Sequence, residues 1–244
     1  MRFLIFQHSL AEDVGNFTRL FPEQGVAFDR VIFRRGDAIP DLAAYDALWV
    51  LGGAMDVWDV DEFPWLIDEK RAIRSFITEM NRAYLGICLG HQLMADALGG
   101  TCGPVPKTKV IGPHTVRLNT QGLVDPLFSG SETEFHAMQW HSVQVAQMPE
   151  DATCLASSES CNCEAMKLGD RAWGVQFHPE LWQPTLDRWA TNESALSALD
   201  RHFGDNGFSH LCGLCSPLIP QFEDNARRLL INFLNASSGR THTA

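Results

Sequence analysis

Residues 86–100, GICLGHQLMADALGG, place a cysteine at the junction of a strand and a helix. Residues 83–87 form a short apolar run typical of a buried strand. Residues 89–98 carry apolar side chains at helical spacing until a glycine pair ends them. Glycines stand two positions before and two positions after Cys88. Because glycine has no Cβ, this spacing permits a sharp turn that lifts the cysteine above the carboxyl end of the strand.

Strands and helices alternate on the amino-terminal side of this junction. Apolar runs predict strands over residues 2–6, 26–33 and 45–53, and an amphipathic pattern predicts a helix over residues 64–81. Such alternation is typical of an α/β fold. We therefore expect a mostly parallel central sheet with helices on both faces.

The pattern changes beyond residue 100. Short apolar segments joined by polar turns predict a small antiparallel addition, with strands over residues 107–118, 141–148, 152–158 and 172–177.

Helical patterns return near the carboxyl end, over residues 184–203 and 220–236, and we expect a loop between them. This organisation predicts three parts: one domain over residues 1–190, a C-terminal helical extension over residues 191–236 packed on the same domain, and a frayed tail over residues 237–244.

Composition and charge restrict the class of protein. Hydrophobic residues make up 45% of the 244 residues, so the chain can bury a full core. The formal net charge of −11 argues against nucleic acid or an anionic membrane as a partner. No apolar stretch approaches the roughly 18 residues that span a bilayer, and the apolar start carries no small-residue cleavage site. We expect a cytoplasmic protein.

The seven cysteines are expected to be reduced thiols. Cys161 and Cys163, with Cys212 and Cys215, invite interpretation as a zinc site. The first pair, however, has a spacing that matches zinc knuckles poorly. We expect neither a metal nor another cofactor.

Two interpretations of Cys88 remain open at this point. It is either a nucleophile, with a helix N-terminus behind it that favours the thiolate and offers N–H groups to an oxyanion, or a small buried residue at a strand end. A thiol nucleophile needs a base, and nine histidines compete for that role. His178 ends an apolar strand and is followed by Pro179 and Glu180. An extended chain puts His178 and Glu180 on the same side, where the carboxylate can orient the imidazole.

Together, GICLGHQ (86–92) and GVQFHPE (174–180) resemble the class I, or triad, glutamine amidotransferase family. The glycine pair Gly52-Gly53 after YDALWVL resembles the glycine-rich turn that faces the nucleophile in that family. The stretch from Leu51 to Lys70 is similar to stand-alone, GMP-synthase-like members. The resemblance covers about residues 45–180 and implies a flavodoxin-like amidotransferase fold.

The resemblance also implies roles for individual residues. Cys88 would attack the side-chain amide of glutamine, His178 would act as base and then as acid, and Glu180 would orient His178. Two backbone N–H groups would form the oxyanion hole, those of Gly53 and Leu89. Substrate-binding positions would be Gly52, Gln92, Ser142 and Val143. His91 is expected to be a polar helix residue rather than a second base.

Three functions remain compatible with the sequence. The first is a glutaminase that supplies ammonia to an acceptor or synthetase subunit on another chain, since no phosphate-binding loop is present. The second is a hydrolase or transferase of γ-glutamyl conjugates that uses the same triad. The third is a sensor that binds without turnover.

Overall fold

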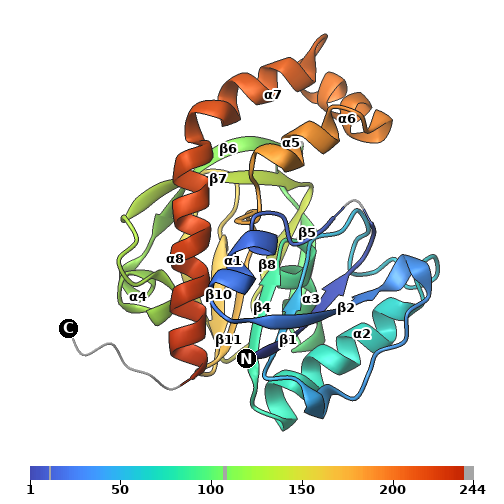
Figure 1. Cartoon of the computed structure of the whole chain (residues 1–244), viewed down its shortest axis with the longest axis vertical. Helices are drawn as coiled ribbons and strands as arrows, with labels where there is room; N and C mark the ends of the chain where they lie inside the picture. Colours follow the sequence, from blue (N-terminus) through green and yellow to red (C-terminus); the bar gives the residue numbers. More distant parts are fainter. Residues whose placement is uncertain (11, 107–108, 239–244) are drawn as a thin grey trace.

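The computed structural model describes residues 1–10, 12–106 and 109–238 (Figure 1). Within them, one nine-stranded sheet has the order β2-β1-β3-β4-β11-β10-β9-β6-β7, and β5 pairs with β8 in a second, two-stranded sheet. Helices cover both faces of the large sheet, and further helices follow at the carboxyl end. This arrangement confirms the predicted fold class.

One half of the large sheet is parallel, and the turns at its carboxyl edge carry the candidate site residues. Except for its edge strand, its strands are buried almost throughout, which explains their nearly uninterrupted apolar sequences. Carboxyl ends of parallel strands meet at one edge, so the turns after β3, β4 and β11 lie side by side there. In sheet order the strands are β2 (Ala27–Ile32), β1 (Arg2–Gln7), β3 (Ala47–Val50), β4 (Ala83–Ile87) and β11 (Ala172–Val175).

The other half is antiparallel, as expected, but contains more strands than the sequence suggested. The prediction missed β5, β7 and β10. Buried Gln139 and His141 interrupt the apolar pattern of β7, which is held by pairing with β6 along its length, while β5 and β10 have only four residues each. The antiparallel strands of the large sheet are β6 (Val110–Leu118), β7 (Glu134–His141), β9 (Ala152–Ser157) and β10 (Ala165–Leu168), and the separate sheet consists of β5 (Thr101–Pro104) and β8 (Val143–Gln147). Residues 107 and 108 of the predicted strand 107–118 lie outside the described residues.

Two helix layers enclose the parallel strands. On one face, α2 (Trp65–Arg74) and α3 (Leu89–Ala97) pack on an apolar cluster, and α2 ends in a π-helical turn over Ser75–Glu79. On the other, α1 (Phe17–Glu23) and α8 (Ile219–Ser237) share a second cluster. Phe233 of α8 packs edge-on against Trp49 of β3, with ring centroids 5.4 Å apart. A short helix, α4 (Thr120–Val124), precedes β7.

The carboxyl-terminal helices differ from the prediction. The expected single helix over 184–203 is two helices, α5 (Gln183–Trp189) and α6 (Glu193–Phe203), because Asn192 caps α6 by accepting a hydrogen bond from the Ala195 N–H at 3.0 Å. The expected loop after it was wrong, since it contains α7 (Gly207–Cys215).

Packing explains the error over α7. Gly, Asn and Ser suggested a loop, but Leu211 and Cys215 are fully buried in a third cluster with Leu199 of α6 and Ile111 and Met138 of the sheet. Figure 1 shows α5, α6 and α7 grouped at one end of the molecule, and α8 returning along the sheet. Residues 239–244 of the expected tail lie outside the described residues. No helix in the described ranges combines the length and the apolar character needed to cross a membrane.

Candidate active site

Cys88 stands in a strained turn between β4 and α3. Its φ of 52° and ψ of −103° are unusual for a residue with a side chain. A Cβ on Gly86 would lie 2.4 Å from the backbone of Gly90, and one on Gly90 would lie 2.1 Å from the carbonyl oxygen of Val50. Both glycines are therefore required by close backbone contacts, as the sequence predicted.

The thiol of Cys88 is 5% exposed and is surrounded by polar groups. The Gln176 Nε2 group donates to Sγ at 3.6 Å, and the carbonyl oxygen of Trp140 lies 3.9 Å from Sγ. Gln92 lies behind Gln176: its Nε2 group donates to Gln176 Oε1 at 3.2 Å and to the carbonyl oxygen of Val143 at 2.9 Å. Gln92 lines the cleft, but its amide nitrogen is occupied by the protein. Gln176 belongs to the second motif, yet the sequence assigned it no role.

His178 and Glu180 lie opposite the thiol. Nδ1 of His178 and Oε1 of Glu180 are 2.6 Å apart, which leaves Nε2 as the nitrogen available to the thiol. The backbone N–H of His178 donates to the carbonyl oxygen of Met138 at 2.8 Å and anchors the turn to β7. Burial lowers the pKa of His178, but the charges of Glu180 and Cys88 outweigh burial and hold that pKa well above its usual value. The surroundings therefore favour an imidazolium next to the thiol.

The glycine turn after β3 faces this pair. A Cβ on Gly52 would lie 3.1 Å from Cε1 of His178 and 3.7 Å from Cβ of Cys88. Gly53 is the next residue, and Leu89 is the first residue of α3, so its N–H is among the helix N-terminal groups without a partner inside the helix. The structure thus brings both predicted oxyanion positions to the turns beside the thiol.

A cleft of about 400 Å³ opens over these residues. Gly52, Gly53, Ser142 and Val143, which the sequence analysis named as substrate or oxyanion positions, line it. One wall was not predicted, because it belongs to α5, α6 and the residues between them. The side chains that form this wall are Thr185, Arg188, Trp189, Asn192, Ser194, Ala195, Ala198 and Arg201.

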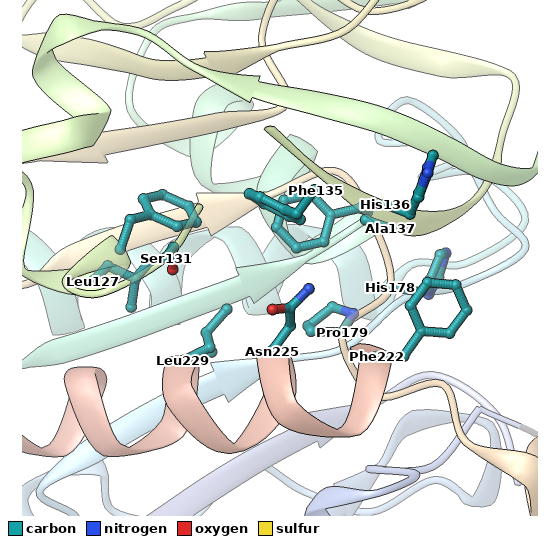
Figure 2. A pocket seen from close by; sticks show the side chains of 12 residues that line it. Leu127, Ser131, Phe135, His136, Ala137, His178, Pro179, Phe222, Asn225 and Leu229 are labelled. Carbon is teal, nitrogen blue, oxygen red and sulfur yellow. The ribbon is translucent and has the colours of Figure 1, made fainter. Parts of the chain in front are cut away.

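A second, much smaller cavity of about 30 Å³ lies between β7, the turn after β11 and α8 (Figure 2). It is lined mainly by apolar side chains, among them Leu127, Phe135 and Phe222. Figure 2 shows Pro179 and His178 at one end of it. This volume fits one or two water molecules and excludes an amino acid.

His91 lies away from the cleft. It is completely buried, and a Cβ on Gly174 of β11 would come within 2.5 Å of its Nδ1 atom. Burial lowers the pKa of His91 to about 4, so the ring is neutral at ordinary pH. These features favour the interpretation of His91 as a packing residue.

The two cysteine pairs lie on different elements. Cys161 and Cys163 belong to the connection between β9 and β10, whereas Cys212 and Cys215 belong to α7. Among the residues that the structure describes, no three His, Cys, Asp or Glu side chains converge in a way that could hold a metal ion.

The Cys88 turn, the His178–Glu180 pair and the glycine turn after β3 thus lie together at the carboxyl edge of the parallel strands. The model of the class-I glutamine amidotransferase family matches residues 15–192. The chain therefore belongs to the class-I glutamine amidotransferase family.

Individual relatives agree with this assignment. Gamma-glutamyl peptidase 3 of Arabidopsis thaliana is 28% identical over 199 residues, which cover 79% of this chain and 78% of that protein. A subunit of the glutamine-hydrolysing GMP synthase of Sulfolobus acidocaldarius is 32% identical over 145 residues, 59% of this chain and 72% of that protein. The crystal structure of a glutamine amidotransferase from Thermotoga maritima matches with a TM-score of 0.86 at 26% identity, covering 96% of this chain and 98% of that one.

Proposed function

We propose that this chain hydrolyses the side-chain amide of glutamine, or of a γ-glutamyl conjugate, through a triad of Cys88, His178 and Glu180. The observation that carries the proposal is the placement of His178. Its Nδ1 lies 2.6 Å from Oε1 of Glu180, and the charges of Glu180 and Cys88 raise its pKa.

The first half of the reaction forms a thioester. The Cys88 thiolate bonds to the amide carbon, and the resulting oxyanion accepts hydrogen bonds from the N–H groups of Gly53 and Leu89. The oxyanion then collapses, the C–N bond breaks, and His178 gives its Nε2 proton to the leaving amine. With glutamine as substrate, the leaving group is ammonia.

The second half regenerates the enzyme. A water molecule attacks the thioester carbon and gives one proton to Nε2 of His178. The C–S bond breaks, Cys88 leaves as a thiolate, and the γ-carboxyl group of glutamate gives the second proton of the water to solvent and is released as the carboxylate. The carboxylate of Glu180 stabilises the imidazolium, which gives up its proton in the first half and forms again in the second.

A second candidate substrate class is a γ-glutamyl amide with a leaving group larger than ammonia. The cleft of about 400 Å³ lies in the range of sites for ligands larger than a single amino acid. Its outer wall contains Arg188 and Arg201. Arg188 is paired with Asp13 at 2.9 Å, whereas Arg201 has no ion pair in the described part of the chain. Arg201 is therefore a cation suited to a carboxylate on the leaving group.

The relatives represent both alternatives. One is named a γ-glutamyl peptidase and another is named for GMP synthase. If glutamine is the preferred substrate, we propose that the released ammonia passes to a synthetase on a separate chain.

Glutamate release by the purified chain tests the proposal, with glutamine, γ-glutamyl amino acids and a neutral γ-glutamyl amide measured in parallel. C88A is expected to be inactive toward all of them, and a glutamine-like diazo-ketone should label Cys88 rather than Cys154 or Cys212. A preference for glutamine supports the glutaminase, and a preference for the conjugates in kcat/KM supports the second substrate class. Full activity of C88A would refute the triad.

A further inference from the structure

A buried ion pair behind the glycine turn has no part in the reaction steps above. His8 follows β1 and Glu69 lies on α2, and both side chains are 0% exposed. Nε2 of His8 lies 3.0 Å from Oε1 and 3.2 Å from Oε2 of Glu69. Burying two titratable groups in an apolar core is costly unless they are paired, so the position of this pair calls for a functional reason.

The other nitrogen of His8 contacts the glycine turn directly. Nδ1 of His8 lies 2.8 Å from the carbonyl oxygen of Gly52. Burial lowers the pKa of His8, but the charge and hydrogen bond of Glu69 outweigh burial and raise it. Both partners of the ring are acceptors, so the charged ring, which the raised pKa favours, donates from Nε2 to Glu69 and from Nδ1 to Gly52.

The geometry of the peptide bond carries this contact to the site. The carbonyl group of Gly52 and the N–H group of Gly53 belong to one peptide unit, and in a trans peptide they point in opposite directions. The described residues contain no cis peptide bond. Holding the oxygen toward His8 therefore aims the N–H of Gly53 away from His8.

The thiol and the base lie next to the same glycine. Gly52 lies directly against His178 and Cys88, where a Cβ would meet them at 3.1 Å and 3.7 Å. Because a Gly-Gly peptide has little intrinsic preference for one orientation, an external hydrogen bond determines it. A charged donor on the oxygen also polarises the peptide and strengthens its N–H as a donor.

We propose that His8, held by Glu69, is a positioning residue that fixes the Gly52-Gly53 peptide with the N–H of Gly53 directed at the oxyanion. The proposal rests on the function proposed above. It implies that the oxyanion site is formed in the isolated chain and needs no partner to complete it.

Substitution of His8 tests the proposal in the full-length chain. Loss of one oxyanion donor typically costs about 10²- to 10³-fold in kcat, and H8A misplaces that donor without deleting it. We expect kcat of H8A to fall by about 10- to 100-fold with KM for the substrate changed less than about threefold. H8N puts an amide N–H near the position of Nδ1, so its kcat should be at least about tenfold higher than that of H8A. This recovery should be clearest in the double variant with E69Q, because E69Q removes the carboxylate charge that loses its partner when His8 is replaced.

Two controls separate a positioning role from a structural one. F33L changes a ring that stacks on His8 at 6.0 Å but leaves the hydrogen bond to Gly52, so its kcat should stay within about threefold of wild type. Alkylation of Cys88 by iodoacetamide needs no oxyanion site, so its rate in H8A should equal that of the wild type.

The outcomes are distinguishable. An H8A protein that is folded and labels normally, yet keeps full kcat, would overturn the positioning role. So would an H8N/E69Q variant no faster than H8A. Activity that survives in C88A would instead refute the proposed function, whatever the result for His8.

Discussion

Replacing Glu180 by glutamine isolates the electrostatic part of the His–Glu contact. Glutamine can still accept the Nδ1–H hydrogen bond of His178 but carries no charge. The two side chains are 17% and 15% exposed, so solvent screens their interaction only partly. Nδ1 and Oε1 are 2.6 Å apart, which puts the centres of the two delocalised charges about 4 Å from each other. At that separation the attraction is about 4 kcal/mol with an effective dielectric constant near 20, an upper limit that corresponds to about 10³-fold in rate.

We therefore expect E180Q to lose between about 10²- and 10³-fold in kcat for glutamate release, with a smaller change in KM. The sign of the pH effect follows from the same charge. Glu180 raises the pKa of His178, so its removal lowers that pKa. The basic limb of the pH–rate profile, where the imidazolium loses its proton, should move to lower pH.

Initial rates over a range of pH, on protein whose circular dichroism matches wild type, give both quantities. H178A, which lacks the proton carrier itself, should be less active than E180Q. A kcat for E180Q within threefold of wild type, or an unshifted basic limb, would refute this assignment of roles.

Three further outcomes are expected. G90A forces a Cβ to within 2.1 Å of the carbonyl oxygen of Val50, so it should destabilise the fold by about 2–3 kcal/mol and lower Tm by roughly 5–10 °C in a thermal scan; an unchanged Tm would contradict the contact. R201A should raise KM for γ-glutamyl amino acids by about 3- to 10-fold and leave glutamine unaffected, while R71A, an exposed arginine outside the cleft, serves as the matched control; equal effects on both substrates would exclude a leaving-group contact. The pKa of His91 is about 4 in the folded chain and near 6.5 in the unfolded chain, so the unfolded chain binds more protons between these values and His91 reduces stability as pH falls through that window. We therefore expect the free energy of unfolding of H91Q, measured in urea, to depend less on pH than that of wild type, by up to about 1.4 kcal/mol per pH unit within this window. Equal pH dependences of the two proteins would show that the His91 ring titrates normally.

The sequence was most informative where chemistry depends on neighbours along the chain. The turn at Cys88 needs glycines two positions away on each side, and the His178–Glu180 contact needs two residues separated by one on an extended strand. Both requirements are local, so spacing alone predicted them. The alternation of strands and helices predicted a parallel sheet, whose carboxyl edge brings the turns after β3, β4 and β11 together.

Other features depended on contacts between distant residues and could not be predicted in this way. The segment with α7 has the composition of a loop and is helical because Leu211 and Cys215 are buried against other elements. The cleft acquires its outer wall only when α5 and α6 fold over the sheet edge. His8 and Glu69 are 61 positions apart. Glu69 lies in the stretch over residues 51–70 that resembles other family members, but nothing in that stretch indicates a contact with His8. Their pairing arises because β1 and α2 pack beside the turn after β3. Local spacing thus predicted the turn at Cys88 and the His178–Glu180 contact, whereas long-range packing determined the groups that hold and surround them.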